Sequence, residues 1–215
     1  MKTKTINLYH FDELPENLQR VAIRELSDIN VDHNWWTFTY EDFIRLAGKL
    51  GIGVNSSDIH FSGFYHQGQG SSYRGCVDVV AMIRSVSRGE WEQDAVYPLD
   101  LPTVTPGIQR IARVIDAGAM SWNAWVKPLR SMSIDVQQEY YFRSYNPHAL
   151  ENVNAALIET EKFVSNVCRR LNETLFKELY NDHDYLTSDQ AIKETILANG
   201  YYFNKFGKLE SEEGD

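Results

Sequence analysis

The stretch DIHFSGFYHQGQGSSYRGCVDVV, residues 58–80, decides the fold, because two strand-like segments flank a loop of Gly, Gln and Ser. Aromatic and β-branched side chains favour strands, whereas Gly and Ser favour turns. We therefore predict a β-hairpin whose turn lies near 68–70. The predicted register pairs Ile59 with Val79, Phe61 with Val77, Gly63 with Gly75 and Tyr65 with Tyr73 on the core face, and His60 with Asp78, Ser62 with Cys76 and Phe64 with Arg74 on the other face.

Five other segments repeat apolar residues every three or four positions, which is the period of an amphipathic helix. Thr39, Thr105 and Thr187 are predicted as the caps of three of these helices. The longest segment has the length that a helix needs to span a whole sheet. The predicted helices lie within residues 14–30, 39–52, 105–118, 147–180 and 187–200.

Two segments alternate apolar and polar residues, the pattern of an antiparallel strand with one covered face. They are MSWNAWVKPL (120–129) and SMSIDVQQEYYF (131–142), and we expect them to pair. A short strand is expected within 201–206, and prolines and mixed charges predict an irregular, exposed excursion at 87–102. The sequence thus predicts an α+β fold, in which helices pack on one face of an antiparallel sheet of about four or five strands and one long helix lies near 147–180.

The composition is typical of a globular protein, with 43% hydrophobic and 24% charged residues among 215. We expect a single α+β domain over 1–208 and an acidic, disordered tail at 209–215. The net charge of −9 argues against direct binding to nucleic acid. Because Cys76 and Cys168 are the only cysteines, and no stretch resembles a signal peptide or a membrane span, we expect a cytoplasmic protein without a membrane partner.

His60 and Asp78 are the candidates for catalysis, because a carboxylate can orient a histidine that acts as a base. No nucleophile stands beside them at a diagnostic spacing, so a structural ion pair is the simpler interpretation. Two further segments contain metal-ligand residue types, but polar helix ends explain both, and neither a metal centre nor a cofactor is predicted. Those residues are Asp28, Asp32 and His33, and Asp182, His183 and Asp184.

The loop of the predicted hairpin could contact a ligand or a peptide, although it lacks the lysine and the following helix of a phosphate-binding loop. Trp35 and Trp36 could form a binding hot spot or pack into the core. The long helix could pair with a second copy of itself and give a homodimer. The candidate binding residues are Trp35, Trp36, Phe64, His66, Gln67, Gln69, Ser71, Ser72 and Arg74.

Four segments in this order resemble a family of small proteins encoded by bacteriophages and mobile elements: YHFDELPENLQRVAIREL, HNWWTFTYEDFIRLAGKLGI, DIHFSGFYHQGQGSSYRG and YLTSDQAIKETILANGYYF. Members often carry the label "antitoxin of toxin-antitoxin stability system". The family motif falls on Phe61, Ser62, Gly63, Phe64, Gly68, Gly70, Tyr73 and Gly75. Gln69 replaces an acid of the relatives, so a role that needs that carboxylate does not transfer. The resemblance implies a protein that acts inside the cytoplasm of a bacterial host.

Three functions are consistent with these observations. The first is a non-enzymatic protein that binds and inhibits a host factor, either as a counter-defence inhibitor such as an anti-CRISPR or as an antitoxin-like neutraliser of a toxin. The second is a nucleotide or small-ligand binding protein, a sponge for a defence signal. The third is a hydrolase that uses His60 and Asp78. We favour the first, because the residues form no complete catalytic set and the aromatic side chains suit a protein interface.

Overall fold

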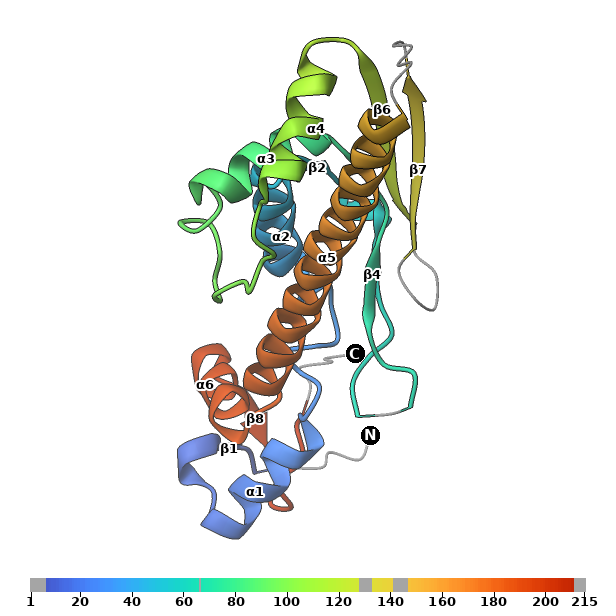
Figure 1. Ribbon diagram of the computed structural model, residues 1–215. Coiled ribbons are helices and arrows are strands. Elements are labelled where there is room, and N and C mark those ends of the chain that lie inside the picture. The colour runs from blue at the N-terminus through green and yellow to red at the C-terminus, as the bar shows by residue number, and fades with distance from the viewer. Residues whose placement is uncertain (1–6, 66, 128–132, 141–146, 211–215) are drawn as a thin grey trace. The chain divides into compact units, whose positions relative to one another are not determined.

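The computed structural model describes residues 7–65, 67–127, 133–140 and 147–210 (Figure 1). The chain forms two compact units, of which one comprises Met1–Trp36 with Tyr180–Asp215 and the other comprises Thr37–Leu179. The α+β class is as predicted. The expectation of a single domain over 1–208 stays a prediction, and the predicted tail lies outside the described residues from 211 onward.

The unit Thr37–Leu179 is built on a four-stranded antiparallel sheet with the strand order β2-β5-β6-β7. The predicted pairing of its two longest strands is confirmed, with Met120 opposite Tyr140 and Lys127 opposite Ser133. Side chains on β6 alternate between buried and exposed, so one face of the sheet is covered. The strands are β2 (Ile52–Gly53), β5 (Gly75–Val77), β6 (Met120–Lys127) and β7 (Ser133–Tyr140).

Helices cover the buried face of this sheet (Figure 1). They are α2 (Thr37–Lys49), α3 (Val79–Arg88), α4 (Pro106–Asp116) and α5 (Pro147–Leu186). Thr105 caps α4 as predicted, and its hydroxyl accepts a hydrogen bond from the Ile108 amide at 3.3 Å. The predicted cap Thr39 is wrong, because α2 begins at Thr37 and Thr39 is buried within the helix.

The hairpin exists, but its predicted register is wrong. Its strands are β3 (Ile59–Phe61) and β4 (Ser71–Tyr73), with Ile59 opposite Tyr73 and Phe61 opposite Ser71. The loop is therefore longer than a turn at 68–70 and runs from 62 to 70. The second predicted strand divides instead, because β5 leaves the hairpin and pairs with β2 and β6. Gly63 and Gly75 consequently do not face each other.

Residues 79–88 form α3, whereas the predicted hairpin included a strand up to Val80. Valines favour strands, but Asp78 is a helix cap, and its carboxylate accepts a hydrogen bond from the Ala81 amide at 2.9 Å. Gly51, which has a φ of +72°, fixes the entry to this helix, because its carbonyl accepts from the Asp78 amide at 2.8 Å. A Cβ on Gly51 would lie 2.8 Å from the Asp78 carbonyl oxygen.

The long helix α5 was predicted over 147–180 and continues to Leu186. Its central apolar positions are buried, as the helical period of the segment predicted. It ends where the Thr187 amide donates to the carbonyl of His183 at 3.0 Å. The buried positions that the helical period predicted are Leu157, Val164, Cys168, Leu171, Leu175 and Leu179.

The unit Met1–Trp36 with Tyr180–Asp215 has its own small core. Ser188, not the predicted Thr187, caps α6 and accepts from the Ala191 amide at 3.2 Å. A short strand lies within the predicted 201–206, although its antiparallel partner β1 was not predicted. The elements are α1 (Glu16–Glu25), α6 (Asp189–Asn199), β1 (Tyr9–His10) and β8 (Tyr202–Phe203), and the core residues are Phe11, Leu14, Ala22, Ile192, Ile196 and Phe203.

A search for membrane spans among the described helices found none with both the length and the apolar character that a bilayer requires.

Candidate functional site

The proposed catalytic pair is not a cross-strand pair. His60 lies opposite Ser72 and is exposed, whereas Asp78 caps α3 outside the hairpin. The predicted pairing of His60 with Asp78 is therefore wrong, because each strand position changes its partner when the turn moves.

Polar contacts and one aromatic contact hold the hairpin against α5, and we call this set of contacts the latch. The Ser71 hydroxyl lies 3.0 Å from the Asn172 carbonyl oxygen and 3.1 Å from its Oδ1, and it can donate to either acceptor. In return, Asn172 Nδ2 donates to the Ser71 carbonyl at 3.0 Å. The Phe64 ring lies 5.7 Å from the ring of Phe176 on the same helix. Two predicted binding residues, Phe64 and Ser71, thus hold the hairpin on its own helix.

Beneath the latch, Tyr73 is fully buried and its hydroxyl donates to the Cys168 carbonyl at 3.1 Å. Its ring meets Phe43 in an edge contact at 5.1 Å. Burial raises the pKa of Tyr73 well above its usual value, and the neighbouring Cys168 adds to the rise. Burial also raises the pKa of the Cys168 thiol to about 12, so both groups are neutral. These buried, uncharged groups form the floor on which the hairpin packs.

Side chains of the hairpin loop bond to the backbone of the loop itself. The Ser62 hydroxyl lies 3.1 Å from the Gly68 carbonyl and 3.3 Å from the Gly70 carbonyl. The Tyr65 amide donates to Gln69 Oε1 at 2.7 Å. Gln69 therefore braces the loop from within, which differs from the ligand contact that the sequence suggested.

Tyr65 is the notable residue of this loop. Within the described part of the chain it is the only residue other than glycine with a positive φ, at 67°. Such a conformation costs a non-glycine residue about 1–2 kcal/mol. Even so, 65% of the residue is exposed. Nothing in the sequence indicated this conformation, because a backbone angle produces no period or motif.

The other predicted binding residues have different settings. Gln67 and Arg74 are exposed, Ser72 is half-buried, and His66 lies outside the described residues. In the unit Met1–Trp36 with Tyr180–Asp215, Trp35 and Trp36 are half-buried and meet edge to face at 5.8 Å. The Trp35 ring also lies 5.6 Å from the His183 ring. The two tryptophans therefore pack within their own unit in part.

Metal binding was considered for two segments that contain His and Asp. Among the residues that the structure describes, no group of three or more His, Cys, Asp or Glu side chains is placed to hold a metal ion. His33 instead lies beside its neighbour, with Nδ1 3.1 Å from Asp32 Oδ1, and both side chains are exposed.

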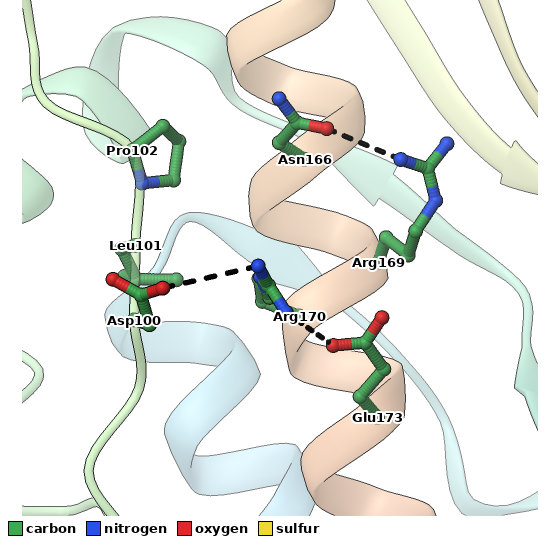
Figure 2. Close-up of a pocket in the computed structure, with 7 residues that line it drawn as sticks. All are labelled: Asp100, Leu101, Pro102, Asn166, Arg169, Arg170 and Glu173. Carbon is green, nitrogen blue, oxygen red and sulfur yellow. Dashed lines mark hydrogen bonds and ion pairs between the residues drawn. The ribbon is translucent and has the colours of Figure 1, made fainter.

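A polar groove lies between residues 97–102 and α5, away from the predicted residues (Figure 2). Arg170 Nη1 lies 2.9 Å from Glu173 Oε2, and its Nη2 lies 3.8 Å from Asp100 Oδ2. One hollow of the groove has a volume of about 310 Å³. The expectation of an exposed excursion at 87–102 is wrong in part, because Trp91 and Leu99 are buried. The hollow is lined by Asp100, Leu101, Pro102, Asn166, Arg169, Arg170 and Glu173.

Comparison with known families gives one match. The family described as "Domain of unknown function (DUF8835)" matches residues 35–189, which include the hairpin and the groove. A search of curated proteins and a search of solved structures found no match.

Proposed function

We propose that this chain, which belongs to the family described as "Domain of unknown function (DUF8835)", is a non-enzymatic protein of a phage or mobile element. In this proposal it binds and inhibits a host factor. The host factor is a defence protein such as a CRISPR component, or a toxin that the chain neutralises. The resemblance of the hairpin motif to phage proteins supports this setting, and with it a bacterial cytoplasm. The contact surface that we propose is the tip of the hairpin, residues 62–65 and 67–70.

The observation that carries the proposal is the exposed Tyr65 ring on a braced backbone. A residue that served only the fold would be expected to have a buried side chain, or to be glycine at this φ. Tyrosine is enriched among the residues that dominate binding energy at protein interfaces, because a rigid ring contributes a large contact area. Tyr65 therefore has the features of an anchor that inserts into an apolar pocket of a partner.

The latch on α5 supports the same interpretation. Ordering a flexible loop on binding reduces affinity, so a loop fixed in advance binds more tightly. Here the bond that the Tyr65 amide donates to Gln69 Oε1 fixes the backbone at Tyr65, and the contacts of Phe64 and Ser71 with α5 fix the base of the loop. The tip is thus presented in one conformation.

The test is a comparison of capture from bacterial lysate by the native chain and by Tyr65→Ala. Phe38→Ala is the matched control, because Phe38 is also an aromatic residue of the unit Thr37–Leu179 and is 78% exposed. Loss of an interface hot spot reduces the binding free energy by about 2 kcal/mol or more, which raises the dissociation constant about 30-fold. We expect Tyr65→Ala to lose a partner that Phe38→Ala retains.

The captured protein is then purified and its own activity is measured with and without the chain. The proposal predicts inhibition by the native chain and by Phe38→Ala, and weak inhibition by Tyr65→Ala. The proposal fails if no stable partner is recovered, if Tyr65→Ala captures it equally well, or if the partner stays fully active.

The other predicted functions have less support. A ligand cradle within the hairpin loop would use Ser62 and Gln69, but both side chains already bond to the loop itself. A homodimer through α5 would need an apolar stripe on its surface, but Leu157, Val164 and Leu171 are buried in this chain. Homodimer formation stays a prediction that the molar mass in solution can test.

A further inference from the structure

We propose that the groove between residues 97–102 and α5 binds a small molecule that carries one phosphate or carboxylate group beside hydroxyl or amine donors. Arg169 holds the anionic group in this proposal. The site is separate from the hairpin tip and does not depend on the host-factor proposal.

Arg169 has spare capacity for an anion. Its Nη1 donates to Asn166 Oδ1 at 3.1 Å, and the described residues give it no ion pair. A guanidinium carries five N–H donors in a planar fork that matches the oxygens of a carboxylate or phosphate. Asn166 lies one helical turn before Arg169 and orients the guanidinium, which lines the hollow from the side of α5 away from Asp100 (Figure 2).

The two carboxylates of the groove limit which anions fit. Arg170 lies between Asp100 and Glu173, so these three side chains together carry one negative charge. They disfavour a ligand with several separate anionic groups. Their free oxygens accept hydrogen bonds, and the Asp100 side chain is 95% exposed. A ligand with one anionic group and neighbouring hydroxyl or amine donors complements both Arg169 and the two carboxylates.

The dimensions and the walls of the groove favour a small molecule. A second hollow of about 200 Å³ shares Asp100, Arg170 and Glu173 with the first, which has about 310 Å³. The first volume lies at the lower end of the range for ligand sites, about 300–1,000 Å³, and the second lies below it. Leu101 and Pro102 provide an apolar wall opposite the helix, against which a carbon skeleton can pack.

The proposal is tested by titrating the isotope-labelled full chain and following its amide resonances. Ribose 5-phosphate carries the proposed combination of groups, ribose lacks the anion, and gluconate replaces the phosphate with a carboxylate. We expect saturable shifts at residues 166–173 with ribose 5-phosphate or gluconate, and none with ribose. The stronger of the two active probes identifies the anionic group.

Arg169→Gln keeps the size and polarity of the side chain and removes its charge. We expect it to weaken binding about 10- to 100-fold, the effect of losing a charge-assisted hydrogen bond. Arg110→Gln is the matched control at an exposed position on α4 and should bind like the native chain. Circular dichroism of both variants establishes that they are folded.

Three results would overturn the proposal: no saturable shift at residues 166–173 with either anionic probe, equal shifts with ribose, or native affinity in Arg169→Gln. Tyr65→Ala should retain binding in this assay, so failure of the groove and failure of the hairpin interface are distinguishable.

Discussion

The contact between Asn172 and Ser71 gives a quantitative prediction about the latch that holds the hairpin. Asn172→Ala removes the bond from Nδ2 to the Ser71 carbonyl and the alternative acceptor Oδ1 of the Ser71 hydroxyl. One lost hydrogen bond costs about 1 kcal/mol, and a part-buried carbonyl without its donor adds to that cost. We expect the free energy of unfolding to fall by about 1–2 kcal/mol.

Helix propensity acts in the opposite direction and needs its own control. Alanine favours a helix over asparagine by roughly 0.5 kcal/mol. Asn154→Ala makes the same exchange at an exposed position of α5. The difference between Asn172→Ala and Asn154→Ala isolates the latch.

The assay is urea unfolding followed by circular dichroism, for the native chain and the variants Ser71→Ala, Asn172→Ala and the double variant. Because the two side chains share one bond, the double variant should lose less than the sum of the single losses, by about 0.5–1 kcal/mol. Additive losses, or an Asn172→Ala variant as stable as Asn154→Ala, would refute this account of the latch.

Three further predictions concern the floor and the sheet beneath the hairpin. Gly75→Ala should lower the free energy of unfolding by about 1–3 kcal/mol, because the new Cβ would lie 2.8 Å from the Gly53 carbonyl oxygen. Gly70→Ala is the control, because its Cβ would meet open space, and it should change the free energy of unfolding in urea little. In the native protein an alkylating reagent should label the exposed Cys76 quickly and the buried Cys168 only after unfolding, which mass spectrometry can follow. Alkaline titration should lower the free energy of unfolding above about pH 9, because the folded-state pKa of Cys168 is raised from 9.0 to about 12. The unfolded chain therefore loses the thiol proton first, and stability falls as the pH rises. The Cys168 thiol contributes at most about 1.4 kcal/mol per pH unit to this fall. A Cys168→Ala variant with the same alkaline slope would contradict that assignment.

The helical period predicted most of the helices, and the alternation on residues 120–142 predicted the central strand pair. Both patterns depend on burial of one face, which is a local property of the sequence. The register of the hairpin depends instead on contacts with α5 that are about 100 residues away in the chain, such as the bond from Ser71 to Asn172. No local pattern encodes that contact, so the turn was misplaced.

The candidate site was less predictable than the fold, for related reasons. Gln69 was identified as a polar loop residue, but its bond to the Tyr65 amide exists only in the folded loop. Arg169 is one of several charged residues on a long amphipathic helix, and its place in a groove depends on the irregular segment 97–102. α3 was missed because its valines match a strand, although Asp78 is a recognisable cap.

The most direct test of the proposed host interface is photo-crosslinking from position 65. A photoreactive phenylalanine derivative replaces Tyr65 in one variant and the exposed Tyr202 in a control, and both are expressed in the bacterial host. The account predicts that position 65 crosslinks to one host protein that position 202 does not reach. No adduct from position 65, or the same adducts from both positions, would contradict it.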